Sequence, residues 1–274
     1  MNGSIIFTSR QPYTDRSLVD HELEVRQMLL EQSREFFFRL LPQNIQAWNP
    51  EELWQAEQMC KLVNGLPLAI ILATNLIRDG LATFAEILEM LKSRELLSRW
   101  SLAGSGIASE SPLAILWEAN ICRLRNDTLM LLRVIAFLDP DGIDETMLTN
   151  TKAQQLGDIL PSEPPAIILS LRDLSDHSLI RRDTSTLSVH RLTQDATIQL
   201  MDVKTRGVAF DIAARLMWMT LPKQENRMLM DSLKRTGHKY LPHIEYLKTR
   251  IWEFSLFETY RSIHFAEVAY AGSW

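Results

Sequence analysis

Cysteine is scarce in this sequence, with only Cys60 and Cys122 among 274 residues. Each lies in a stretch whose apolar spacing predicts a helix, and neither has the neighbouring cysteines or histidines that a metal cluster needs. Two isolated cysteines suit a reducing compartment, in which thiols stay free. We therefore interpret both as small core residues.

Long hydrophobic runs and an excess of one charge are also missing. The longest apolar run, residues 66–73, is far shorter than the roughly 18 to 20 residues that span a bilayer. Twenty-nine basic residues against 34 acidic ones give a net charge of -5, so no overall field attracts nucleic acid or anionic lipid. The N-terminus lacks the basic region and long apolar core of a signal peptide. We expect a cytoplasmic chain that binds neither membrane nor nucleic acid.

Several motifs that carry chemistry are absent. No Gly-x-x-x-x-Gly-Lys-Ser/Thr loop supplies amides for phosphates, and no hydrophobic strand is followed by a run of acids for magnesium. There is no Gly-x-Ser-x-Gly elbow. His238 and His243 are too far apart for the i, i+4 pair of a helical metal site, and we interpret them as surface or packing residues. We expect no autonomous ATP hydrolysis, no catalytic residue and no metal ligand.

What the sequence does contain is mostly helical. Hydrophobic residues make up 46% and charged residues 23%, as in globular proteins. Pro50 with two following acids predicts a helix start, and Trp54 is expected on the buried side of that helix. Asn64-Gly65 predicts its end, and Leu66-Pro67 begins another helix that is apolar almost all round. The fold class is therefore expected to be mainly α.

A second pattern follows the linker-like residues 104–106. Helices are predicted to begin near Pro112, Asp127, Asp144 and Pro164, and then two short strands, residues 178–182 and 186–190, flank a polar turn. Helices followed by such a hairpin predict a winged helix. From residue 195 onward the spacing is helical again, with the expected buried positions Ile198, Leu200, Val208, Ile212, Leu216, Leu241, Ile244 and Leu247.

Four segments occur in the order found in NB-ARC proteins and their fungal relatives with helical repeats. Residues 5–10, Ile-Ile-Phe-Thr-Ser-Arg, resemble the strand whose end carries that family's sensor arginine. Residues 64–69, Asn-Gly-Leu-Pro-Leu-Ala, resemble its Gly-Leu-Pro-Leu-Ala motif. Residues 174–180 and 189–192 resemble its winged-helix hairpin and terminal histidine motif. The chain thus resembles the C-terminal part of an NB-ARC or STAND-type, NLR-like nucleotide switch, without the phosphate loop.

The resemblance implies three residues that contact a nucleotide. Arg10 would report the terminal phosphate, since a guanidinium pairs well with phosphate oxygens. Pro67 would pack against the base or sugar, and His190 would donate to the β-phosphate of ADP. The family commonly has Met-His-Asp at this last point, whereas this chain has Val189-His190-Arg191, so only the histidine carries over. ADP or ATP is expected only where an N-terminal phosphate-binding part is supplied.

Each of these residues also has an ordinary structural interpretation. Arg10 can be a surface arginine after a strand, Pro67 a proline that begins a helix, and His190 a histidine bonded to backbone in a wing. The resemblance further implies the domain order. Residues 1–42 would be a remnant of a nucleotide-binding α/β domain, 43–103 a small helical domain, 107–201 a winged helix, and 202–274 a helical segment where tetratricopeptide-like repeats begin.

The function implied is that of a regulatory fragment of an ADP/ATP switch in signal transduction, with other protein domains or chains as partners. These partners would be an upstream nucleotide-binding domain and proteins bound by helical repeats. One alternative is a non-catalytic helical adaptor. Another is a DNA-binding winged helix, which Arg172, Arg181, Arg182 and Arg191 near the wing would support.

Overall fold

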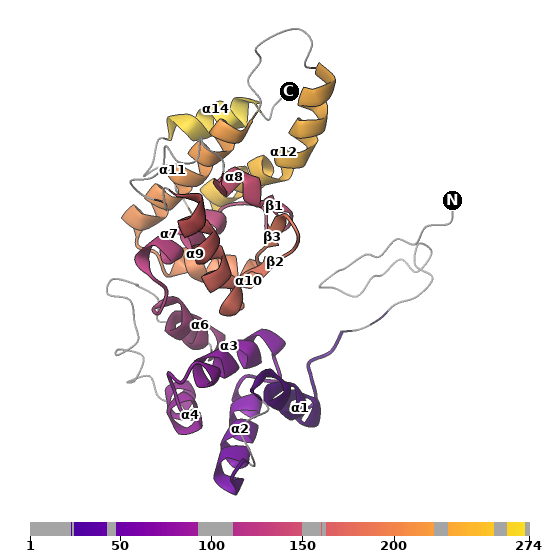
Figure 1. Cartoon of the computed structure of the whole chain (residues 1–274), viewed down its shortest axis with the longest axis vertical. Helices are drawn as coiled ribbons and strands as arrows, with labels where there is room; N and C mark the ends of the chain where they lie inside the picture. Colours follow the sequence, from indigo (N-terminus) through magenta and orange to yellow (C-terminus); the bar gives the residue numbers. More distant parts are fainter. Residues whose placement is uncertain are drawn as a thin grey trace.

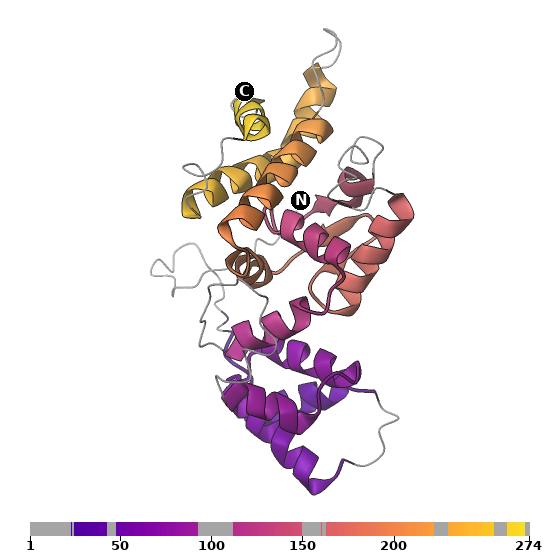
Figure 2. The same ribbon diagram turned by 90° about the vertical axis from the view of Figure 1, so that its left-hand side faces the viewer.

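The computed structural model describes residues 23, 25–42, 48–92, 112–149, 160, 163–221, 230–254 and 262–271. Apart from one small antiparallel sheet, the regular elements of these residues are helices, which confirms the expected mainly α fold. Figures 1 and 2 show two groups of elements stacked along the long axis, residues 30–121 at one end and residues 126–271 at the other.

The first group is a bundle of helices, which we call the helical domain. Its second helix begins at Pro50 as predicted, because the Asn49 side chain accepts from the Glu52 amide at 2.8 Å and the Glu52 carboxylate accepts from the Asn49 amide at 3.0 Å. The group contains α1 (Leu30–Leu40), α2 (Pro50–Leu62), α3 (Pro67–Arg78), α4 (Phe84–Lys92) and α6 (Pro112–Ile121).

Helix α3 lies at the centre of the helical domain and is buried, as its apolar sequence predicts. Beside it, the rings of Phe37, Phe38, Trp48 and Phe84 pack with centroids 5.1–5.8 Å apart. The expectation that Trp54 is buried is wrong. Its side chain is 49% exposed, and the Lys92 ammonium lies 5.5 Å from the centroid of its ring.

Helix α6 packs chiefly against α3. The fully buried Asn120 side chain fixes this contact, donating through Nδ2 to the Leu72 carbonyl at 3.1 Å and to the Leu116 carbonyl at 2.7 Å. The sequence assigns residues 107–121 to the winged helix. In the structure, α6 lies chiefly against α3 of the helical domain and also contacts α10 (Arg191–Gln199) of the second group.

The second group has the element order of a winged helix, namely a helix, a strand, two helices and a hairpin. Its three strands are antiparallel in the order β1-β3-β2, with Ile143 opposite Leu187 and Arg182 opposite Leu187. Strand β1 was not expected from the sequence. The elements are α7 (Asn126–Ile135), β1 (Ile143–Asp144), α8 (Glu145–Thr149), α9 (Pro164–Asp176), β2 (Arg181–Arg182) and β3 (Thr186–Ser188).

Of the remaining helices, α12 and α14 contact α11, and α11 in turn packs on α7 and α8 of the winged helix. A row of rings joins them, because Phe210 lies 5.5 Å from Phe137 at the end of α7 and 5.3 Å from Phe265 in α14. Of the expected buried positions in this part, Leu241 is wrong, since it is 38% exposed. The helices are α10, already given, then α11 (Val203–Thr220), α12 (Met230–Glu253) and α14 (Ile263–Ala271).

Within the described part of the chain, every helix is either too short or too polar to pass through a bilayer.

Candidate functional site

The segment that resembles Gly-Leu-Pro-Leu-Ala forms the turn between α2 and α3. The Gly65 amide donates to the Cys60 carbonyl at 3.1 Å and the Asn64 amide to the Lys61 carbonyl at 3.1 Å, which together form a Schellman motif at the end of α2. Asn64 and Gly65 both have positive φ, 51° and 61°. The turn therefore needs a residue that tolerates the left-handed region at two successive positions.

Gly65 also presses against the chain that leads into α1. A Cβ placed on it would lie 2.4 Å from the Met28 carbonyl oxygen and 2.9 Å from Ser33 Oγ. Neither distance leaves room for a carbon atom. The glycine is thus required by its surroundings as well as by its φ, and it fixes how the chain before α1 meets the start of α3.

Pro67 is the first residue of α3, and its ring is exposed to solvent. A proline at this position leaves no amide unpaired, because the first amides of a helix have no partner within it. The residues that follow it in the helix, Ala69 and Ile70, are buried. Pro67 is therefore an accessible apolar surface at the free end of a buried helix.

His190 is exposed and is the N-cap of α10. Its Nδ1 accepts from the Leu192 amide at 3.2 Å. An imidazole nitrogen that accepts cannot carry the proton, so the proton of the neutral ring is on Nε2. The capping bond fixes the tautomer and leaves Nε2–H as a donor that faces away from the helix start.

Of the three residues that resemblance selects, Arg10 lies outside the described residues. Pro67 and His190 lie in different groups of helices. Among the described residues, no hydrogen bond or ring contact joins them. The structure does not bring them together by direct contact.

The two groups of helices are joined at the other end of α3. Asn75 Nδ2 donates to the His177 carbonyl at 2.8 Å, and Arg78 Nη2 donates to the Asp176 carbonyl at 2.8 Å. Both acceptors lie at the end of α9, where Ser178 takes a positive φ of 56°. The Asp173 and His177 side chains, clustered in the sequence, shape this end, with His177 Nδ1 2.7 Å from the Asp173 carbonyl oxygen.

Asp79, the C-cap of α3, joins two arginines at this junction. Its carboxylate accepts from Arg123 Nη2 at 2.9 Å and from Arg78 Nε at 3.1 Å. Burial raises the pKa of the carboxyl, but the hydrogen bonds from Arg123 and Arg78 outweigh it, so the pKa lies below its ordinary value. The carboxylate is therefore held ionised between its partners.

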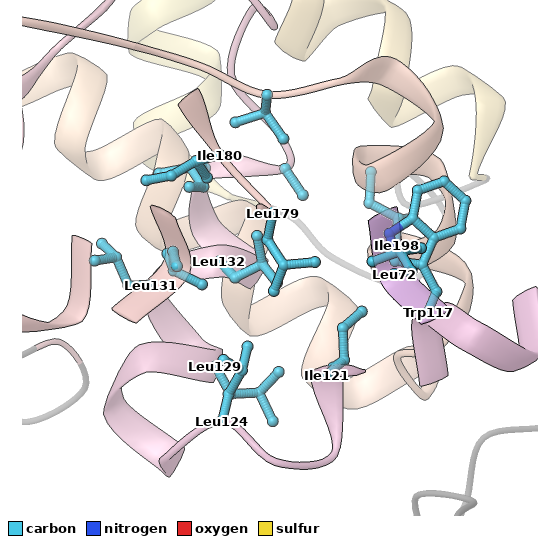
Figure 3. Packing of buried hydrophobic residues seen from close by; sticks show 14 of the residues in the cluster. Leu72, Trp117, Ile121, Leu124, Leu129, Leu131, Leu132, Leu179, Ile180 and Ile198 are labelled. Atoms are coloured by element: carbon cyan, nitrogen blue, oxygen red, sulfur yellow. The ribbon is translucent and has the colours of Figure 1, made fainter. Parts of the chain in front are cut away.

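An apolar contact completes the junction. Figure 3 shows the Trp117 ring of α6 beside Leu72 of α3 and Ile198 of α10. Trp117 is 3% exposed, and among the described residues its Nε1 has no hydrogen-bond partner. The indole thus bridges the helical domain and the winged helix by packing, with one donor unsatisfied.

The exposed face of α9 is the part of the winged helix that would read DNA. Its first half is apolar, with Ile168 46% and Leu169 56% exposed next to Pro165. Arg172 lies beyond them, with its Nε 3.7 Å from the Asp176 carboxylate. The first half of this exposed face is therefore apolar, and its arginine lies beside a carboxylate.

One of the two arginines of the wing is already paired with a carboxylate of the chain. Arg182 donates to both oxygens of the Glu145 carboxylate at 2.8 Å, and this hydrogen bonding raises the pKa of the guanidinium. The pair fixes β2 to α8, while the neighbouring Arg181 is exposed.

Helix α12 makes contacts that the sequence did not predict. Lys239 forms an ion pair with Asp144 of β1, and the Asp139 amide donates to His243 Nδ1 at 3.1 Å. His243 was interpreted as a surface or packing residue. It is 1% exposed and bonded to backbone 104 residues away in the chain. In the sequence, only the i, i+4 spacing of Lys239 and His243 could have indicated that both lie on one face of a helix.

The same face of α12 continues toward α10. The Tyr246 hydroxyl donates to Gln194 Oε1 at 2.7 Å, and Arg250 Nη2 lies 2.6 Å from the Asp195 carboxylate. Gln194 is itself fully buried and donates to the Leu138 carbonyl at 2.8 Å. Helix α10, which begins at His190, is therefore bonded to α12 on one side and packed on α6 on the other.

Residues 119–206 match a family described as "Domain of unknown function (DUF7779)". The matched stretch runs from the last turn of α6 to the first turn of α11 and contains the whole winged helix. Comparison with curated proteins gives no match.

Proposed function

We propose that this chain is the regulatory part of an NB-ARC-type ADP/ATP switch that acts in signal transduction. In this proposal, an N-terminal phosphate-binding part supplies the nucleotide site, and the chain passes the state of that site to its C-terminal helices. The chain performs no hydrolysis itself.

The observation that carries the proposal is the placement of α3. Pro67 lies exposed at its first residue, while Asn75 and Arg78 at its other end hold the winged helix. With a rise of about 1.5 Å per residue, a rigid helix of this length separates the two ends by roughly 16 Å. Because α3 is buried along its length, a displacement at Pro67 moves the junction as well.

His190 supports the proposal through its tautomer. With Nδ1 accepting from Leu192, the neutral ring keeps Nε2–H as a donor, as a contact to a β-phosphate oxygen requires. The exposed ring of Pro67 fits an apolar contact to a base or sugar. Each of these side chains offers a contact of a kind that an adenine nucleotide can use, but neither provides a cradle of amides for its phosphates. The bound nucleotide would supply the charge that His190 senses.

The experiment is co-purification of nucleotide. The chain is expressed alone and together with any in-frame coding sequence upstream of Met1, and nucleotide released by denaturation is measured by chromatography. We expect ADP with the longer protein and none with the chain alone. His190→Ala in the longer protein should lose most of the ADP, because its donor to phosphate is removed.

Thr184→Ala is the matched control, since Thr184 is exposed at the tip of the hairpin, six residues from His190 in sequence. It should retain ADP. The proposal fails if the longer protein carries no ADP, or if His190→Ala retains as much as Thr184→Ala.

A second candidate function is a non-catalytic protein-interaction adaptor. It is favoured by the exposed apolar side chains of Ile168 and Leu169 on α9. Binding of a partner that is lost in an Ile168→Glu, Leu169→Glu variant and is the same with and without ADP would support the adaptor. Binding that requires ADP or ATP would support the switch.

A further inference from the structure

Helix α12 carries two stripes of side chains, all of them buried or half-buried except the exposed Lys239. One stripe is apolar and buried, and α12 is in contact with α11. Its members are Tyr240, Ile244, Leu247 and Ile251. The other stripe is polar and faces the winged helix. Its members, at helical spacing, are Lys239, His243, Tyr246 and Arg250.

The polar stripe is complementary in charge to the winged helix. Lys239 pairs with Asp144, and Arg250 pairs with Asp195. Burial raises the pKa of the Asp144 carboxyl, but hydrogen bonds from Lys239 and Thr146 outweigh this and hold the pKa below its ordinary value. One end of the stripe is thus held by the carboxylate of Asp144 in β1, and the other end by that of Asp195 in α10.

Between the two ion pairs lies His243, the most buried member of the stripe, at 1% exposure. Its Nδ1 accepts from the Asp139 amide at 3.1 Å, and the ring also bonds to the backbone of Gly142. A protonated imidazole has no acceptor, because both nitrogens then donate. Protonation of Nδ1 would therefore break the bond to Asp139 and leave that amide without its partner.

The groups around the ring decide how readily it takes a proton. Burial lowers the pKa of His243, and the charge of Lys239 one turn earlier lowers it further. The Asp139 carboxylate and the Gly142 backbone act in the opposite direction. The balance is a pKa below the ordinary value of 6.5.

Other groups lie farther along the contact. Tyr240 packs with its ring centroid 6.5 Å from that of His243. Asp144 is held by Lys239. From α11, the Arg206 guanidinium lies 5.3 Å from the ring of Phe254, the residue that follows α12.

We propose that α12 is a detachable strap on the winged helix, and that protonation of His243 releases its polar face. In the neutral state, His243 accepts from Asp139 and completes the contact between the two ion pairs. In the protonated state the ring repels Lys239, loses its bond and seeks water, so the face from Lys239 to Arg250 separates from β1 and α10. This inference does not depend on nucleotide.

The direction with pH follows from the sign of the shift. The released helix binds the proton at the ordinary pKa of His243, and the docked helix binds it only at a lower pH. Docking is therefore complete above about pH 6.5 and weakens as the pH falls from there toward the docked pKa, by up to about tenfold for each pH unit.

The test is hydrogen exchange of the full chain, measured by mass spectrometry between pH 7.5 and pH 5.0. Rates at each pH are divided by those of the unfolded peptides, which removes the intrinsic effect of pH. Residues 239–253 and 139–144 should lose protection together below about pH 6.5. Residues 67–78 of α3 provide the internal control, since they are remote from His243 and should keep their protection.

Two variants separate His243 from other acid-sensitive groups. His243→Asn keeps an acceptor near the Nδ1 position but does not titrate, so the loss of protection in this pH range should disappear. Lys239→Met removes the positive charge that lowers the pKa of His243 in the docked helix. The docked and released pKa values then come closer together, so the loss of protection between pH 7.5 and pH 5.0 should become smaller. Far-UV circular dichroism at pH 7.5 checks that both variants are folded.

The proposal is overturned if residues 239–253 keep their protection down to pH 5.0 in the unmodified chain. It is also overturned if His243→Asn shows the same loss as the unmodified chain, since carboxylates would then be responsible. A pH-dependent loss of protection in Lys239→Met as large as that of the unmodified chain contradicts the role assigned to the ring, and this outcome can be read even if His243→Asn fails to fold.

Discussion

At the scale of single residues, Gly65 has the least freedom of any glycine whose surroundings are described. Its φ of 61° and the 2.4 Å between a Cβ and the Met28 oxygen act together. Gly80 has a similar φ of 67°, but nothing lies within 4 Å of a Cβ there. The pair therefore separates the cost of the backbone conformation from the cost of the contact.

We expect Gly80→Ala to lower the free energy of unfolding by about 1–2 kcal/mol, the cost of a left-handed alanine. Gly65→Ala should cost this and roughly 1–3 kcal/mol more, because Met28 or Ser33 must move. Denaturant unfolding followed by circular dichroism measures both. Equal losses in the two variants would show that Met28 and Ser33 can move away from the new Cβ without lowering the free energy of unfolding.

The two cysteines should differ sharply in reactivity. Burial raises the pKa of the Cys60 thiol to about 11, and Cys60 is 2% exposed, whereas Cys122 is partly exposed. At pH 8 only about one Cys60 in a thousand would be a thiolate, the form that reacts. A chromogenic disulfide reagent should therefore label one thiol per native chain and two in denaturant. Rapid labelling of the Cys122→Ser variant under native conditions would contradict this.

The sequence was most informative where one residue has a strong local effect. Pro50 predicted a helix start, and Asn64-Gly65 predicted its end, because capping and positive φ depend on near neighbours in the chain. Trp54 and Leu241 were placed wrongly, since which side of a helix is covered depends on distant partners. The hydrogen bond that holds the buried His243 comes from the backbone at Asp139, and nothing in the sequence indicated this distant partner.

At the scale of elements, the end of α3 offers a test of the junction. Asp79→Asn keeps the shape of the side chain but removes the charge that Arg78 and Arg123 share. The Arg123 and Asp79 side chains are 15% and 25% exposed, so the loss should be about 1–3 kcal/mol of unfolding free energy at pH 7. Denaturant unfolding measures it.

The pH dependence gives the same test a direction. Because the folded pKa of Asp79 is lowered from 3.8, its contribution is present above that value and is lost as the pH falls through the lower folded pKa. Asp176→Asn is the control, because its side chain is 66% exposed and 3.7 Å from Arg172, and it should change stability by less than about 0.5 kcal/mol. A loss as large as that of Asp79→Asn would contradict the junction's special role.

Helices were easier to predict than strands in this chain. The starts of α2, α3, α6 and α9 are marked by proline, and the hairpin of β2 and β3 is marked by a polar turn. Strand β1 has two residues, too few for an alternating pattern, and it forms only because β3 pairs with it. The same reason explains why Asp144 was expected only at a helix start.

At the scale of the whole molecule, the charge balance and the surface of α9 argue against DNA binding. The net charge is -5, and the exposed face of α9 presents Ile168 and Leu169 before a single arginine. We expect no shift of a DNA duplex by micromolar protein in 50 mM salt. A shift that weakens steeply as salt increases would contradict this, since released counterions are the mark of phosphate contacts.

From the sequence, the two residues proposed to contact a nucleotide were easier to find than the residues that join the two groups of helices. Pro67 and His190 were found through their resemblance to motifs, whereas Asn75, Arg78 and Asp79, which join the two groups of helices, lie in no motif. Their partners are 44 to 102 residues away in the chain. Contacts over such separations require the fold.

Helix α11 has two neighbours, α14 and α12, that are held in different ways. The contact of α11 with α14 includes the packing of Phe210 on Phe265, in the row of rings that begins at Phe137. Apolar attraction of this kind weakens on cooling. The strap that lies beside α11 is held to the winged helix by Asp144 and Asp195, whose ion pairs weaken in salt. A cold sample at low ionic strength should therefore loosen α14 first, and a warm sample at high ionic strength should loosen α12 first.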